Sequence, residues 1–234
     1  MPLKHQLVNR LPFAYNMYLR MREPFQAHIF SKIYRTNRWA DPESVSGAGS
    51  SLQVTHVVRE ELPRILKRLG AASLLDAACG DHLWMSRVHL DNCKYMGCDI
   101  VPKLIEENRA KYGERGREFR VLDVTKDRLP RADVVLVRDC FVHLPHRLIW
   151  KALRNIGASG SKYLLTTTYP RQQNSDIFTG RWRPLNLQAS PFLFPEPLLR
   201  LNEEIDEWGG RFPDRSLALW PVSAIPEGSE TQRR

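Results

Sequence analysis

Two acidic residues of this chain each end a short apolar run, with a spacing of about twenty residues. Asp76 follows residues 73–75 and precedes a turn of small residues, and Asp99 follows residues 95–98. This layout is typical of a nucleotide-type cofactor site at the carboxyl ends of adjacent parallel strands. The turn lets the backbone approach the cofactor, and the two oxygens of the second carboxylate match two ribose hydroxyls.

Asp123 places a third acid at the end of a third run, residues 120–122. A single carboxylate in such a place has an ordinary explanation, because Asp often caps a helix or closes a surface turn. Three acids at three successive strand ends are much harder to explain in that way. They favour a cofactor site.

The elements that must position these acids alternate along the chain. Strands are predicted at 73–78, 94–99, 118–123, 132–138 and 162–168. Helices are predicted at 51–69, 82–89, 102–112 and 145–156. The alternation predicts an α/β fold, a doubly wound and mostly parallel sheet with helices on both faces.

The carboxyl-terminal part has a different pattern. Residues 170–196 contain four prolines and little periodicity, so we expect a long functional loop or lid there. Two short runs, 198–202 and 216–220, predict strands that pair antiparallel at the sheet edge.

Composition indicates one sizeable domain, since the 234 residues are 42% hydrophobic and 26% charged. The net charge of +9 is concentrated in residues 1–40, where seven Lys and Arg residues face one Glu among many aromatic residues. We favour amphipathic helices with a solvated basic face there, although the same pattern fits a patch for an anionic partner. The expected organisation is a helical arm and covering loop at 1–50, the main domain at 51–226 and a disordered tail at 227–234.

The sequence has no apolar run long enough for a membrane span, and residues 1–10 do not have the features of a signal peptide. Its four cysteines form no C-x-x-C pair. We therefore expect a cytoplasmic protein without disulfides, and no ligand cluster calls for a metal.

The order of these elements over about residues 47–222 resembles the class I S-adenosylmethionine-dependent methyltransferases. Asp76 and Gly80 match the acid and one glycine of that family's first loop, whereas Ala78 and His82 stand where its other two glycines would be. The resemblance implies a seven-stranded sheet that ends in an antiparallel hairpin. It also implies S-adenosyl-L-methionine as the cofactor.

The resemblance assigns roles to two of the three acids: Asp99 holds the ribose hydroxyls and Asp123 lies near the adenine. A nicotinamide dinucleotide fits less well, because the loop is no G-x-G-x-x-G and the charge of Asp81 would oppose a diphosphate. The glycine-serine loop 46–51 resembles the segment that folds over the donor. The full predicted cofactor set is Gly49, Ser50, Asp76, Ala78, Gly80, Asp81, Asp99, Ile100, Asp123, Val124 and Arg138.

Asp139 and His143 follow the fourth strand, in a segment similar to one that lies under the reactive methyl in small-molecule methyltransferases of this fold. They are the candidate catalytic residues, because imidazole has an unperturbed pKa of about 6.5 that suits a general base. A structural hydrogen bond at the start of the following helix is the other interpretation of His143.

The long loop supplies charge, stacking surface and hydrogen bonding suited to a sugar or an anionic polar acceptor. The predicted acceptor-binding residues are Tyr169, Arg181, Trp182, Arg183 and Asn186. The resemblance thus implies methyl transfer to an O or N atom of a polar small molecule or glycan. A nucleic acid or protein acceptor bound through the basic arm, or a non-catalytic scaffold, is the less favoured alternative, and the oligomeric state is open.

Overall fold

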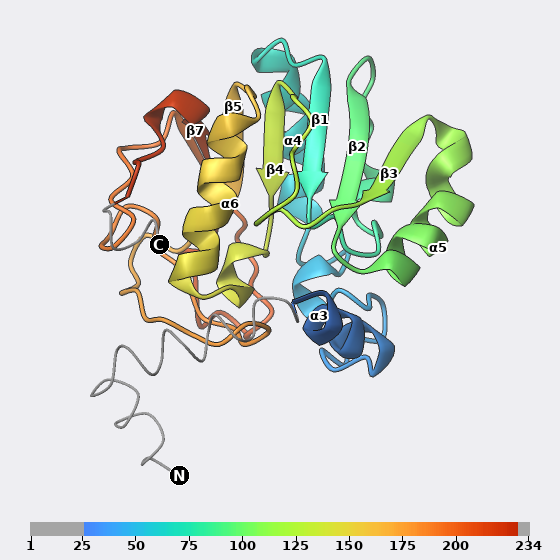
Figure 1. Cartoon of the computed structure of the whole chain (residues 1–234), viewed down its shortest axis with the longest axis horizontal. Coiled ribbons are helices and arrows are strands. Elements are labelled where there is room, and N and C mark those ends of the chain that lie inside the picture. The colour runs from blue at the N-terminus through green and yellow to red at the C-terminus, as the bar shows by residue number, and fades with distance from the viewer. Residues whose placement is uncertain (1–25, 229–234) are drawn as a thin grey trace.

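A computed structural model describes residues 26–228 (Figure 1). Its seven-stranded sheet has the order β3-β2-β1-β4-β5-β7-β6. Strands β1 to β5 are parallel to one another, whereas β7 runs antiparallel to both β5 and β6. The predicted fold class is therefore confirmed. The strands are β1 Ser73–Ala77, β2 Lys94–Asp99, β3 Arg117–Val121, β4 Val134–Val137, β5 Tyr163–Thr168, β6 Leu199–Asn202 and β7 Ser216–Pro221.

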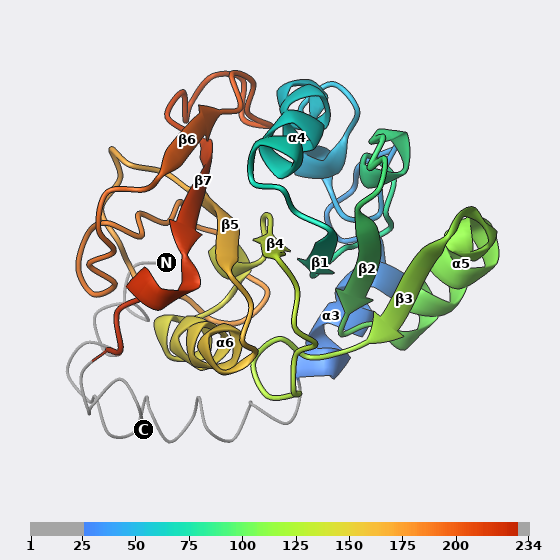
Figure 2. The ribbon, with the colours of Figure 1, turned by 90° about the horizontal axis from the view of Figure 1, so that it is seen from above.

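Helices cover both faces of this sheet (Figure 2). The α-helices of the described residues are α3 Gln26–Arg35, α4 His56–Arg68, α5 Pro102–Tyr112 and α6 His146–Ala158. Strand β4 shows how the two layers form, because its four residues are all fully buried. Val135 and Val137 join the core cluster that contains α6, and Val134 and Leu136 join the cluster that contains α4. Successive side chains of a strand point to opposite faces of the sheet, so the single apolar run of β4 contributes to both cores.

Helix α5 matches its predicted bounds, and Pro102 at its first position suits the fixed backbone angle of proline. The predicted helix at 82–89 is wrong: the structure has only a short 3-10 turn, Met85–Arg87, in that segment. His82 has a φ of 59°, a left-handed conformation that cannot continue a right-handed helix. The apolar residues that suggested a helix are instead buried individually under the sheet, as Trp84 and Met85 show.

The second half of the segment predicted as a lid, 170–196, contributes to the core. Leu185, Leu187 and Phe192 are fully buried in the cluster that contains α6. The backbone amide of Tyr169 donates to the carbonyl of Leu185 at 2.8 Å, which fixes the segment to the end of β5. The segment shows no periodicity because it forms neither a helix nor a strand. Its apolar residues are nevertheless buried in the core.

The predicted helical arm is described only in part, because residues 1–25 lie outside the described residues, as do residues 229–234 of the predicted tail. Within 26–40 the arm forms α3, which lies below the carboxyl ends of the strands in Figure 1. Across residues 26–228, none of the helices combines the length and the apolar character that crossing a membrane requires.

Candidate active site

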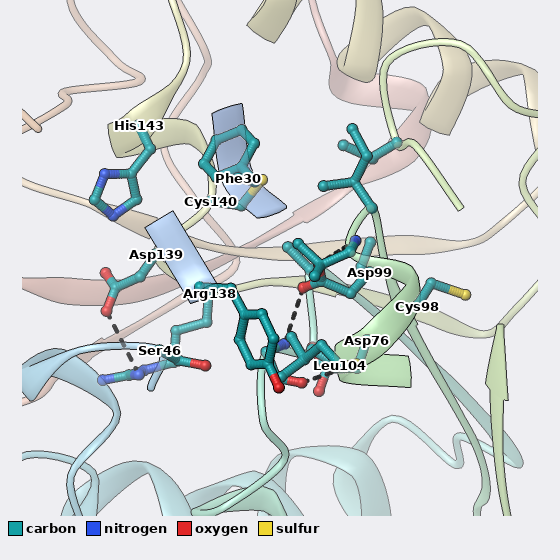
Figure 3. A pocket seen from close by; sticks show the side chains of 18 of the residues that line it. Phe30, Ser46, Asp76, Cys98, Asp99, Leu104, Arg138, Asp139, Cys140 and His143 are labelled. Carbon is teal, nitrogen blue, oxygen red and sulfur yellow. Dashed lines mark hydrogen bonds and ion pairs between the residues drawn. The ribbon is translucent and has the colours of Figure 1, made fainter. Parts of the chain in front are cut away.

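The carboxyl ends of β1, β2 and β4 open onto one cavity, which the loop 45–50 and α3 cover. Figure 3 shows the cavity with His143 and Asp139 on one side and Asp76 and Asp99 on the other. The predicted site residues that line it are Ser50, Asp76, Ala78, Gly80, Asp99, Ile100, Asp123, Val124, Arg138, Asp139 and His143.

Asp76 and Asp99 are buried acids with different partners. One oxygen of Asp76 accepts a hydrogen bond from the Tyr95 hydroxyl at 2.7 Å, and burial raises the Asp76 pKa to about 7. Asp99 accepts backbone amides from Gly80 at 3.2 Å and Val101 at 3.0 Å. Burial raises the Asp99 pKa to about 6, although these amides oppose the rise. Each carboxylate oxygen has two lone pairs, so both acids keep acceptor capacity toward the cavity.

Gly80 and Asp81 join the loop after β1 to the covering loop. Gly80 has a φ of 56°, and a Cβ there would collide with the Ser46 hydroxyl, so the position requires glycine. Asp81 does not line the cavity. Its carboxylate accepts the Ser44 hydroxyl at 2.8 Å and the Val45 amide at 3.0 Å, which fastens the covering loop over the site.

Asp139 has an asymmetric environment. Its Oδ2 lies 2.5 Å from the Arg215 guanidinium and 3.5 Å from that of Arg138. Its Oδ1 is buried and has no hydrogen-bond partner among residues 26–228. Burial opposes ionisation of Asp139, but Arg215 and Arg138 outweigh it and lower its pKa. The residue also has a φ of 54°, a strained conformation of the kind that clusters at functional sites.

Behind Asp139 lies a buried charge cluster, which we define as Arg138, Asp139, Glu203, Glu207 and Arg215. Glu203 accepts from Arg138 at 2.6 Å and lies 3.2 Å from Arg215, and Glu207 also pairs with Arg215. Gly49 packs against this cluster without lining the cavity: a Cβ there would lie 2.9 Å from Asp139 Oδ2. No feature of the local sequence predicted the cluster.

His143 has one defined tautomer. Its Nδ1 lies 3.0 Å from the carbonyl oxygen of Arg181, and a carbonyl only accepts. Nδ1 therefore carries the hydrogen, and Nε2 carries the lone pair. Burial lowers the His143 pKa, which favours the neutral ring. The Trp39 ring stacks on the imidazole with centroids 4.8 Å apart and limits its rotation.

The structure does not bring the five predicted acceptor-binding residues to the cavity. Arg183 is buried and donates to the carbonyls of Phe141 at 2.7 Å and Leu144 at 2.8 Å. Asn186 donates to the Pro170 carbonyl at 2.7 Å. The other three are Tyr169, which is fully buried; Trp182, which packs on Trp208 and Phe212; and Arg181, whose side chain is exposed while its carbonyl contacts His143. The segment therefore supports the wall that holds His143.

Sequence reasoning missed the residues that close the cavity from α3 and from the turn after it. Phe30, Tyr34 and Trp39 line it, and Gln26 Nε2 donates to the Thr125 hydroxyl at 3.2 Å. The spacing of Phe30 and Tyr34, one helical turn apart, was the available signal.

The remaining lining suits an adenosine group. Ile100, Leu104, Leu122 and Val124 offer apolar surface beside the acids. Within residues 26–228 no group of three or more His, Cys, Asp or Glu side chains could hold a metal ion.

Comparison with known proteins agrees with this geometry. A model of the methyltransferase domain family matches residues 75–164. No curated protein sequence matches the chain. Many solved structures share the fold.

Human N-acetylserotonin methyltransferase in complex with SAM has a TM-score of 0.53 and 13% identity, covering 75% of this chain and 53% of that chain. This chain thus spans about half the length of the human protein. The methyltransferase domain of bacterial CtHen1 has a TM-score of 0.53 and 13% identity, covering 72% of this chain and 99% of that chain. An S-adenosylmethionine-dependent methyltransferase from Clostridium acetobutylicum has a TM-score of 0.50 and 11% identity, covering 69% and 89%.

The match over residues 75–164 is to a methyltransferase domain, in agreement with the predicted resemblance. The solved structures, which are 11–13% identical to this chain, share its fold, and one of them was solved in complex with SAM.

Proposed function

We propose that this chain transfers a methyl group from S-adenosyl-L-methionine to a hydroxyl oxygen of a polar small molecule or glycan. The observation that carries the proposal is the pair Asp139 and His143, which lies beside the cavity opposite Asp76 and Asp99. Asp139 Oδ1 is a buried acceptor without a partner among the described residues, and His143 Nε2 carries a lone pair, so each side chain has an acceptor atom to offer and no donor. A hydroxyl group supplies the hydrogen that such atoms need.

Different residues of the cavity would bind different parts of the methyl donor. Asp99 would accept both ribose hydroxyls, and Asp76 would accept the ammonium group of the amino acid end. Asp123 and Val124 would border the adenine. When bound, the donor supplies a methyl group made electrophilic by a positively charged sulfur.

On the acceptor side, His143 Nε2 would take the proton of the attacking hydroxyl while Trp39 and the Arg181 carbonyl hold the ring. Asp139 Oδ1 would accept a second hydrogen bond from the acceptor and so orient it. An amine fits less well than a hydroxyl, because the ionised Asp139 would stabilise its protonated form, which has no lone pair for attack. This electrostatic argument favours O-methylation.

Three measurements test the proposal. We expect S-adenosylhomocysteine to bind the purified chain by calorimetry and NAD not to bind. With labelled donor and a panel of sugars, phenols and amines, label should enter hydroxyl compounds. His143→Ala should lower turnover by about 10²- to 10⁴-fold, the usual contribution of a general base, and leave donor affinity unchanged. Donor binding without transfer to any hydroxyl compound would contradict O-methylation and favour a scaffold.

A further inference from the structure

His82 stands where the resemblance expects a glycine, and the structure gives it an unusual environment. The side chain is fully buried on a backbone with a φ of 59°. The rings of Tyr95, Tyr112 and Phe119 surround it, each with its centroid 4.9 Å away. A buried imidazole on a left-handed backbone is unfavourable, so its polar atoms call for an explanation.

Those polar atoms belong to one continuous chain of hydrogen bonds. Arg117 Nη1 lies 2.7 Å from His82 Nε2, His82 Nδ1 lies 3.0 Å from the Tyr95 hydroxyl, and that hydroxyl lies 2.7 Å from Asp76 Oδ2. A guanidinium only donates, so His82 Nε2 accepts and Nδ1 carries the hydrogen. His82 then donates to the Tyr95 oxygen, and Tyr95 donates to Asp76. The arginine at one end fixes the direction of every bond.

The sheet is shaped to let this chain reach Asp76. In the parallel pairing of β1 with β2, Asp76 lies opposite Gly97, and Tyr95 is two residues earlier on the same face of β2. The Tyr95 side chain must extend past Gly97 to reach the carboxylate. A Cβ at Gly97 would lie 2.9 Å from the Tyr95 oxygen, so only glycine leaves the path open.

We propose that His82 and Tyr95 are positioning residues that hold Asp76 oriented as a hydrogen-bond acceptor for the ammonium group of the methyl donor. The proposal rests on the proposed donor site. It names residues that do not touch the donor but act through Asp76.

The charges around Asp76 give the sign of the pH effect. Burial and Asp99 on β2 raise the Asp76 pKa, whereas the Tyr95 hydrogen bond, Arg138 directly after β4 and Arg117 on β3 lower it. Loss of the Tyr95 hydroxyl therefore raises the Asp76 pKa further above about 7. The carboxylate is then more protonated at neutral pH and accepts the ammonium group less well. Burial lowers the His82 pKa to about 3, so His82 stays neutral over the assay range.

The test is calorimetric titration of S-adenosylhomocysteine into Tyr95→Phe between pH 6 and 9, with adenosine as a second ligand. Adenosine lacks the amino acid end and should bind the variant as it binds the wild type. For S-adenosylhomocysteine we expect about tenfold weaker binding at pH 7, and a loss that shrinks as pH rises and Asp76 ionises. Tyr112→Phe is the matched control, because Tyr112 also packs on His82, and it should leave both affinities unchanged.

A second variant separates backbone from side chain at position 82. His82→Gly suits the φ of 59° and matches the family pattern but removes the imidazole. If position 82 served only the turn, this variant would bind S-adenosylhomocysteine as well as the wild type. We expect instead a loss with the pH dependence of Tyr95→Phe.

Different results would contradict the proposed donor site and the proposed positioning role of His82 and Tyr95. A wild-type chain that does not bind S-adenosylhomocysteine contradicts the donor site. Equal losses for S-adenosylhomocysteine and adenosine, or a loss in Tyr95→Phe that does not change with pH, overturn the positioning role alone. An unchanged affinity in Tyr95→Phe overturns it too, and thermal melting of each variant establishes that the chain is folded.

Discussion

Replacing Arg215 by Met should be among the most destabilising single changes in this chain. The guanidinium is 1% exposed and pairs with Asp139, Glu203 and Glu207. Methionine fills a similar space without the charge, so the variant leaves three carboxylates with Arg138 as the remaining cation of the cluster. Breaking a buried ion pair by removing one partner costs about 3–5 kcal/mol.

That cost is a large share of the total, because domains are stable by about 5–15 kcal/mol. For a chain of this size it corresponds to a fall in melting temperature of about 6–20 °C. The assay is thermal and urea denaturation at pH 5 and pH 8. Arg211→Met is the matched control: Arg211 is exposed in the same connection, and its loss should change stability by about 0.5 kcal/mol or less.

The pH dependence gives the sharper check. In the wild type the low pKa of Asp139 contributes stability at neutral pH that is lost as pH falls through that pKa. Without Arg215, burial is opposed by fewer cations, so we expect the pKa of the Asp139 carboxyl to rise. Protonation at low pH then removes the buried negative charge and lessens the loss of stability in the variant. The difference between wild type and variant should therefore be larger at pH 8 than at pH 5. A difference that is equal at both, or smaller than about 1 kcal/mol at pH 8, would refute the electrostatic reasoning.

Three further changes test other parts of the site. Asp99→Ala should weaken S-adenosylhomocysteine binding by about 100-fold or more, because two hydrogen bonds to a charged group are lost, while the melting curve stays cooperative; near-wild-type affinity would remove Asp99 from the ribose site. Gly80→Ala should also weaken donor binding, since its Cβ displaces Ser46 and the covering loop, and urea denaturation should show a modest loss of stability. Arg183→Met removes the hydrogen bonds to two buried carbonyls, of which that of Phe141 still accepts the Leu144 amide, and should cost about 1–3 kcal/mol; a stability within 0.5 kcal/mol of wild type would contradict this support role.

The parts of the site that could be predicted are those that a short stretch of sequence determines. Asp76 and Asp99 lie at the carboxyl ends of strands whose apolar residues are adjacent in the chain, so the strand end locates the acid. The same holds for β4, where four consecutive apolar residues require cover on both faces. In each case the pattern and the structure depend on the same few residues.

The parts that could not be predicted depend on contacts between distant residues. Arg215 and Asp139 are 76 positions apart, and Glu203 and Arg138 are 65 apart. Neither pair has a local pattern that would mark it. The wrong helix prediction at 82–89 has the same origin. The apolar spacing suggested a helix, but His82 contacts Tyr95 and Arg117, and these distant contacts fix a non-helical backbone.

The reversal of β7 has a consequence for how the site can vary. A parallel strand delivers the residue that follows it to the catalytic edge, as β4 delivers Asp139 and β6 delivers Glu203. Because β7 runs the other way, it delivers the residue that precedes it, Arg215, to that same edge. The connection between β6 and β7 thus has both of its ends at the charge cluster behind Asp139. Its length and composition can change the charges around Asp139 without any change in the residues that line the cavity.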